Sequence, residues 1–152
     1  MEKQEFKIKI NAPKEKVWKV LWEDSSYRQW TSVFAEGSYA VTDWKEGSKV
    51  LFLTGKGEGM VSKIETKRQN EFMSFKHLGA VKNGVEDVDS EQSKQWSGAH
   101  ENYTLKEANG VTELKVEMDI TDDFKDYFMK TWPKALDQVK ELSEKSLQQV
   151  KV

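Results

Sequence analysis

TWPKALDQVKELSEKSLQQV, residues 131–150, is the stretch on which the predicted architecture rests. Within the tail from residue 121 to residue 152, apolar side chains recur at helical spacing and form one stripe: Trp132, Leu136, Val139, Leu142 or Ser143, Leu147 and Val150. This pattern predicts a long closing helix with one buried face. From Pro133 onward the helix would run roughly 27 Å, which is about the width of a six- or seven-stranded sheet.

Pro133 interrupts this pattern, because proline lacks a backbone donor and clashes with the carbonyl four residues earlier. The proline therefore either starts the main helix, with Thr131 or Trp132 near the cap, or kinks it just after DDFKDYFMK. Either geometry turns Phe128 and Trp132 towards the inner surface of a sheet.

The residues before the closing helix have the two-residue period of strands. After Phe34, the stretches SYAVTDW and SKVLFLTG flank the turn-like KEG, and GKGEG leads into a strand from about residue 60 to residue 67. QNEFMSFKHLG indicates the next strand, and residues 99–120 indicate a hairpin closed by ANG at 108–110. The polar residues between Gly79 and Gly98 are too many for a tight turn and predict a flexible flap or elongated loop.

The N-terminal residues add one strand and two short helices. EFKIKI alternates apolar and charged side chains, which predicts a half-buried strand. Asn11 as cap and Pro13 in the first turn would begin a helix whose buried face is Val17, Trp18, Leu21 and Trp22. A second short helical piece follows, with Ser25 as its cap and Trp30 as its large apolar residue.

This order of elements predicts an α+β fold in a single domain, residues 1–152. Six consecutive strands with short connections form an antiparallel meander, whose curved inner face must be covered. The closing helix is the one predicted element long enough to cover it.

The composition argues against several classes of function. Lys and Arg (24) nearly balance Asp and Glu (26), and the net charge of -2 argues against a nucleic-acid partner. The absence of cysteine excludes disulfides, thiolate catalysis and thiolate metal sites. The N-terminal MEKQEFKIKINAP has no apolar core of a signal peptide, and no stretch predicts a membrane span, so we expect a cytoplasmic protein.

No motif predicts a cofactor or a bound metal. GKGEG at 55–59 lacks the following helix and the Lys-Ser/Thr of a phosphate-binding loop. EDVDSE at 86–91 lacks the glycine and final glutamate of a calcium loop. The two histidines, His77 and His100, have no third zinc ligand at a recognisable spacing. No Ser-His-Asp order or nucleophile elbow is present either, so no catalytic residue is assigned.

Five stretches distributed over nearly the whole chain carry a family resemblance. They are INAPKEKVWKVLW at 10–22, Trp30, SFKHLG at 74–79, NYTL at 102–105 and TWPKALDQVKEL at 131–142. Together they resemble the START-like or SRPBCC superfamily, and within it the activators of heat-shock-protein-90 ATPase. The resemblance implies a helix-grip fold: a strongly bent seven-stranded antiparallel sheet around a long C-terminal helix, two short helices between strands 1 and 2, and a cavity between sheet and helix. It implies no single activity, because the superfamily includes carriers, cyclases, oxygenase domains and chaperone partners.

His77 and Glu101 are the most notable polar pair in the sequence. In FMSFKHL, the lysine at 76 indicates that Met73, Phe75 and His77 face inward. Pairing Phe75 with Tyr103 would set Met73 opposite Leu105 and His77 opposite Glu101. A carboxylate beside an imidazole stabilises its protonated form, so the pair suits an acid, a base or an anion-sensing group. The alternative is a purely structural hydrogen bond or a solvated pair.

The six tryptophans are the second notable feature. For Trp18 and Trp22 on the first helix, filling the core is a sufficient explanation. For Trp30, Tyr103, Phe128 and Trp132, core packing and the lining of a cavity are equally good explanations. The candidate ligand-binding residues are Trp30, Phe75, His77, Glu101, Tyr103, Met118, Phe128, Trp132 and Leu136.

Three functions are compatible with these features. The first is binding of a small hydrophobic or amphipathic molecule between sheet and helix, with His77 and Glu101 orienting its polar end. The second is a protein-interaction module that contacts a chaperone, for which residues 80–98 would supply an apolar patch of Val81, Val85, Val88 and Trp96. The third is an enzyme that uses His77 as acid or base on a cavity-bound substrate.

Overall fold

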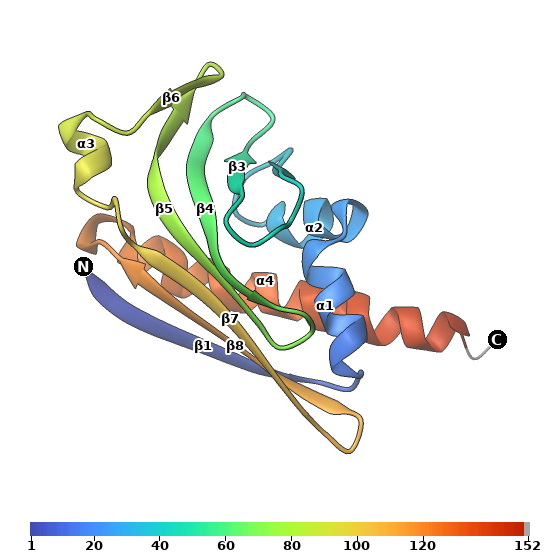
Figure 1. Cartoon of the computed structure of the whole chain (residues 1–152). Helices are drawn as coiled ribbons and strands as arrows, with labels where there is room; N and C mark the ends of the chain where they lie inside the picture. Colours follow the sequence, from blue (N-terminus) through green and yellow to red (C-terminus); the bar gives the residue numbers. More distant parts are fainter. Residues whose placement is uncertain (151–152) are drawn as a thin grey trace.

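The computed structural model describes the backbone of residues 1–150 and the side chains of residues 1–145. It has the predicted α+β architecture, in which a curved antiparallel sheet wraps around a long C-terminal helix (Figure 1). The strands are β1 (Glu2–Ile10), β2 (Tyr39–Val41), β3 (Lys49–Leu53), β4 (Gly59–Arg68), β5 (Phe72–Lys82), β6 (Val85–Asp87), β7 (His100–Ala108) and β8 (Val111–Ile120). The helices are α1 (Lys14–Trp22), α2 (Asp24–Thr31), α3 (Glu91–Lys94) and α4 (Asp122–Val150).

The strand order explains how distant segments meet around one core. Seven strands follow the order β1-β8-β7-β5-β4-β3-β2, and the short β6 adds an eighth by pairing with the end of β5. All neighbouring pairs are antiparallel. Two register shifts interrupt the β4–β5 pairing, between Val61 and Ser62 and between Ile64 and Thr66. Such irregularities bend a strand and increase its twist, which helps the sheet to curve around α4.

Two Asn-Gly turns close hairpins in the second half of the chain. Asn109 and Gly110 both have positive φ, as a two-residue type I′ turn requires, and they join β7 to β8 as predicted. Asn83 and Gly84 have the same geometry and join β5 to β6. Of the two forms expected between Gly79 and Gly98, a flexible flap or an elongated loop, the elongated loop is wrong: the segment holds the end of β5, a hairpin and the short helix α3. The same segment does not form one apolar patch, because Val81 is buried while Val85 and Val88 are exposed.

The helix starts differ from the predicted caps. Pro13, not Asn11, occupies the N-cap of α1, and the Asn11 backbone N–H instead donates to Glu144 Oε2 at 2.9 Å. Glu23 precedes α2, so Ser25 lies inside the helix. Both predicted N-cap residues are therefore wrong. The two predicted helices are nevertheless present, and they bury the expected apolar residues: Val17, Trp18, Leu21, Trp22 and Trp30.

Pro133 neither starts nor ends the closing helix. α4 is continuous from Asp122, so the proline lies well inside it. The Pro133 side chain is exposed to solvent. Trp132, Leu136, Val139 and Ser143 form the buried side of α4, with Leu142 half-buried. Leu147 and Val150, also assigned to this stripe, lie outside the described side chains.

The buried residues of the core come from the inner face of the sheet and from α1, α2 and α4. Near its C-terminal end, α4 is tied to the end of β1: Lys140 Nζ donates to the Lys9 carbonyl oxygen at 3.1 Å and to Glu144 Oε2 at 2.6 Å. Within residues 1–150, no helix is long and apolar enough to cross a membrane.

Candidate ligand pocket

Two neighbouring pockets open between the sheet and α4. The first, here called the aromatic pocket, has a volume of about 260 Å³. Its wall is mostly aromatic and comprises Trp22, Tyr27, Trp30, Thr31, Phe34, Ala35, Ser38, Phe52, Leu53, Thr54, Gly59, Met60, Glu101, Tyr103, Tyr127, Phe128 and Trp132. The second pocket, of about 510 Å³, has a more polar wall that includes Glu58, His77, Lys82, Gln92 and Asp119. Thr54, Gly59, Met60 and Phe128 line both, so the two pockets share a wall.

The aromatic pocket is built where α1, α2 and α4 approach the inner face of the sheet. Tyr27 and Trp30 lie one turn apart on α2, and their rings meet edge to face with centroids 5.4 Å apart. Trp132 on α4 contacts Trp30, with ring centroids 6.2 Å apart, and Phe34, with ring centroids 4.9 Å apart. The rings that form the wall thus also hold one another in place.

The β5–β7 register that was predicted for the inner face is wrong by two residues. Phe75 lies opposite Glu101 and Met73 lies opposite Tyr103. Because the side-chain period of a strand is two, a shift of two keeps every side chain on its predicted face. Met73, Phe75 and His77 are buried as expected, and His77 still reaches Glu101 as a diagonal neighbour.

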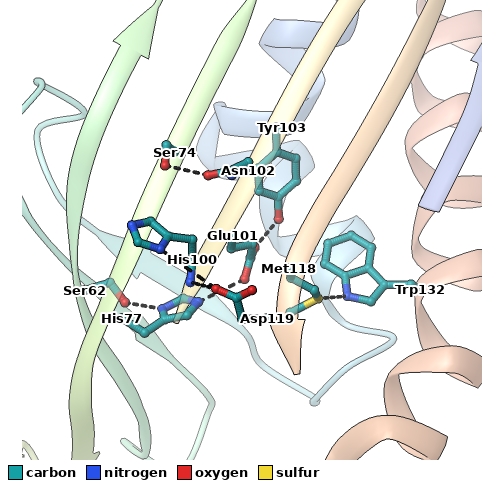
Figure 2. Close-up of polar contacts among 10 residues, drawn as sticks. All are labelled: Ser62, Ser74, His77, His100, Glu101, Asn102, Tyr103, Met118, Asp119 and Trp132. Carbon is teal, nitrogen blue, oxygen red and sulfur yellow. Dashed lines mark hydrogen bonds and ion pairs between the residues drawn. The ribbon is translucent and has the colours of Figure 1, made fainter. Parts of the chain in front are cut away.

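A chain of four polar side chains runs across β4, β5 and β7 (Figure 2). Ser62 Oγ lies 2.6 Å from His77 Nδ1, and His77 Nε2 lies 3.2 Å from Glu101 Oε1. The other carboxylate oxygen, Glu101 Oε2, accepts a hydrogen bond from the Tyr103 hydroxyl. Ser62 is fully buried, and the His77 and Glu101 side chains are 6% and 13% exposed. This chain, Ser62–His77–Glu101–Tyr103, is called the buried polar chain below.

The buried polar chain favours a neutral Tyr103. Burial raises the pKa of the Tyr103 phenol well above its ordinary value, and the charge of Glu101 and its hydrogen bond to the phenol raise it further. Burial, followed by the charge of Glu101, also raises the pKa of Tyr27. Both hydroxyls therefore keep their protons at any ordinary pH.

The buried polar chain connects the two pockets. His77 lines the second pocket, whereas Glu101 and Tyr103 line the aromatic pocket.

Of the other predicted site residues, Trp30, Phe128 and Trp132 line the aromatic pocket, and Met118 lines the second. Trp132 Nε1 donates to Met118 Sδ at 2.7 Å, which links α4 to β8 (Figure 2). Phe75 and Leu136 line neither pocket and lie in the core behind them.

Several residues of the aromatic pocket were not predicted from the sequence. Trp22 was interpreted as core, and its ring is buried, yet it lines the pocket and meets Tyr103 edge to face at 4.8 Å between centroids. The wall also includes Tyr27, Phe34 and Tyr127, which no sequence pattern marked as candidates. Helical spacing gave one usable signal, because Tyr27 precedes Trp30 by three residues and so shares its face.

The geometry limits the chemistry that the site can perform. Ser62 beside His77 and Glu101 has the composition of a nucleophilic triad, but Ser62 is fully buried and lines neither pocket. A substrate in either pocket would not reach its hydroxyl, so Ser62 is a structural partner of the imidazole.

Within the described residues, no group of three or more His, Cys, Asp or Glu side chains is arranged to hold a metal ion. His100 instead contacts Glu65, with Nε2 and Oε2 2.6 Å apart.

A family model and several solved structures match this chain. The family model described as activator of Hsp90 ATPase homolog 1-like protein matches residues 11–144. A search of curated proteins found no significant match.

The structural matches extend over nearly the full length of the chain. The Aha1 dimer from Colwellia psychrerythraea is 19% identical with a TM-score of 0.70, and the match covers 93% of this chain and 95% of that one. Protein MLL2253 from Mesorhizobium loti is 14% identical with a TM-score of 0.73, and 95% and 98% of the two chains are covered. A protein from Cytophaga hutchinsonii is 20% identical with a TM-score of 0.71, and 97% of each chain is covered. At these identities the likeness establishes the fold.

Proposed function

The chain belongs to the activator of Hsp90 ATPase homolog 1-like protein family, and from this premise we propose that it binds a small, largely apolar molecule in the aromatic pocket. The observation that carries the proposal is the composition of the wall, which is mostly aromatic with one charged side chain, Glu101, among its lining residues. Apolar walls with a few convergent polar groups are typical of small-molecule sites.

The wall is suited to bind without rearrangement. Trp132 packs against both Trp30 and Phe34, so the ligand would not have to order these rings. Burial of the ligand's apolar surface would supply affinity at about 25 cal/mol per Å² before the costs of association. In this proposal Trp30, Tyr103, Phe128 and Trp132 contact the ligand, Glu101 orients it, and Phe75 and Leu136 support the wall from behind.

A neutral fluorescent probe tests the proposal directly. N-phenyl-naphthylamine, which brightens in apolar surroundings, should bind the purified protein, and native mass spectrometry should detect retained or competable apolar molecules. Ala35 lines the aromatic pocket, so Ala35→Leu should fill part of it and weaken probe binding by about tenfold or more.

Ala80→Leu is the matched control, because Ala80 lines the second pocket and not the aromatic one. This variant should bind the probe like the wild-type protein. Absence of probe binding to the folded wild-type protein, or equal binding by Ala35→Leu, would contradict the proposal.

A chaperone-binding surface has weaker support. The apolar patch expected within residues 80–98 is divided, since Val81 lies in the wall of the second pocket while Val85 and Val88 point to solvent. Val85 and Val88 alone are a small exposed surface, and scattered exposed apolar residues are common.

A further inference from the structure

We propose that the ligand of the aromatic pocket carries a positively charged hydrogen-bond donor, a protonated amine, which binds at Glu101. This inference rests on the proposed function and specifies the chemical class of the ligand. Three observations carry it: the charge of the wall, the free capacity of the Glu101 carboxylate and the aromatic rings around it.

The charge of the wall selects against an anion. Glu101 is the one charged side chain among the residues that line the aromatic pocket. Within the described residues, its only ion-pair partner is His77. A carboxylate ligand placed beside Glu101 would bring like charges together in a largely apolar space, where repulsion is poorly screened.

The hydrogen bonds of the buried polar chain do not require a charge on His77. If the Ser62 hydroxyl donates to Nδ1, a neutral imidazole carries its proton on Nε2 and donates it to Glu101 Oε1. Tyr103 donates to the other oxygen. In this arrangement the imidazole is neutral and does not offset the negative charge of Glu101, which a cationic ligand would neutralise.

Glu101 also retains room for another donor. An ionised carboxylate offers about four acceptor positions. The described contacts use two, one from His77 Nε2 and one from the Tyr103 hydroxyl. An ammonium group carries its donors on a single compact atom, so it can donate to a carboxylate oxygen that already has one partner.

The aromatic rings favour the same head group. The faces of Trp, Tyr and Phe rings are electrically negative and attract cations within about 6 Å. Trp22 and Tyr27 line the pocket together with Glu101, and Trp22 contacts Tyr103, the donor to Glu101. The remaining rings, including Trp30, Phe34 and Trp132, provide an apolar surface for the body of the ligand.

Four probes with the same hydrocarbon chain separate the head-group classes: octylamine, octyltrimethylammonium, octanol and octanoate. At neutral pH the first is a cationic donor, the second a cation without a donor, the third neutral and the fourth an anion. We expect octylamine to displace N-phenyl-naphthylamine most strongly, with an affinity about 10- to 100-fold above that of octanol, and octanoate to bind most weakly. Octyltrimethylammonium should lie between octylamine and octanol.

Glu101→Gln provides the matched variant. It removes the charge and keeps an oxygen that can accept from Tyr103, so the advantage of octylamine over octanol should fall to less than about threefold while octanol binding stays within about threefold. Thermal unfolding would establish that the variant is folded. The ranking on the wild-type protein tests the inference even if this variant does not fold.

The outcomes distinguish the two proposals. If octanol or octanoate binds as tightly as octylamine, the amine inference is wrong and the apolar pocket stands. Tighter binding of octyltrimethylammonium than octylamine would show that the rings, not a hydrogen bond to Glu101, recognise the head group, and would overturn the donor assignment. If neither N-phenyl-naphthylamine nor any octyl probe binds, the proposed function fails and the inference fails with it.

Discussion

Glu101 is the residue on which the candidate site depends most. Its two carboxylate oxygens contact His77 and Tyr103, residues from two adjacent strands, inside a space otherwise lined by aromatic rings. A buried acceptor of this kind is costly unless its partners are present, so the three side chains must be considered as one unit.

Tyr103 gives this unit a pH dependence that can be measured. The raised pKa of its phenol means that the folded state holds a proton which the unfolded chain releases near pH 10. Below about pH 10 the protonated phenol therefore contributes its full stabilisation to the folded state. As pH rises further, the free energy of unfolding declines by about 1.4 kcal/mol per pH unit for each buried tyrosine. Urea unfolding at a series of pH values from about 9 to 11 should show this decline in the wild-type protein and a shallower one in Tyr103→Phe.

Tyr27→Phe is the natural comparison, since the pKa of Tyr27 is raised for the same main reason, burial. In Tyr27→Phe the free energy of unfolding should fall less steeply with pH, by about as much as in Tyr103→Phe. In the double variant it should fall less steeply still. Identical slopes for wild type and Tyr103→Phe would show that the phenol titrates normally in the folded protein.

Among the elements, the β3–β4 hairpin matters most for the site because its residues border both pockets. Thr54, Gly59 and Met60 line the aromatic pocket and the second pocket alike. Gly59 begins β4 opposite Leu53, and a Cβ atom placed on it would collide with the Phe52 carbonyl group. The hairpin can thus close tightly only with glycine at this position.

Gly59→Ala should therefore destabilise the protein by about 1–3 kcal/mol and weaken probe binding in the aromatic pocket. Gly55→Ala is the control within the same hairpin, because its Cβ would lie 3.4 Å from the nearest atom, the Glu36 carbonyl oxygen. That variant should remain close to wild type in both urea unfolding and probe titration. Equal stability of the two variants would show that the hairpin has more space than its geometry indicates.

The elements also show what the sequence could and could not predict. Period and turn chemistry are local, so the strands, the Asn109-Gly110 turn and the long helix were predictable. Asn83-Gly84 carried the same local signal, but the polar composition of its surroundings favoured a loop, and β6 was missed. The alternative that Pro133 starts the main helix was wrong because the tertiary packing of α4 outweighs the loss of one hydrogen bond.

The candidate site was less predictable than the fold, for a physical reason. Strand period assigns a residue to a face, which is why His77 and Glu101 were expected on the same side. The relative displacement of two strands depends on the whole sheet and not on either sequence alone, so the register was wrong by two. Tyr27 and Phe34 join the pocket only through the packing of α2 and the following segment against α4, which no local pattern specifies.

Across the whole molecule, burial is distributed unevenly. β5 and β8 alternate buried and half-buried residues over most of their lengths, and β4 and β7 have buried residues in their middle parts. In the segment from β6 to α3, by contrast, Ser93 is the one residue of these two elements that is buried. Segments with few buried contacts open without unfolding the rest of the protein.

Hydrogen exchange should reveal this difference. The two Asn-Gly hairpins form an internal comparison, since they share a turn type but differ in burial. We expect amides of β7 and β8 to be protected at least about 100-fold more than those of β6 and α3. Similar protection in the two hairpins would show that β6 and α3 unfold only together with the sheet.

The tie between α4 and β1 has a consequence for behaviour at high concentration. β1 ends the strand order, so one side of it offers unpaired backbone groups on which a foreign strand can assemble. Lys140 and Glu144 already occupy the Lys9 carbonyl and the Asn11 amide at one end, and the outward side chains Lys3, Glu5, Lys7 and Lys9 are charged and exposed. A growing fibril would have to displace the helix and bury these charges, so the edge strand β1 resists pairing with strands of other molecules and the aggregation that follows.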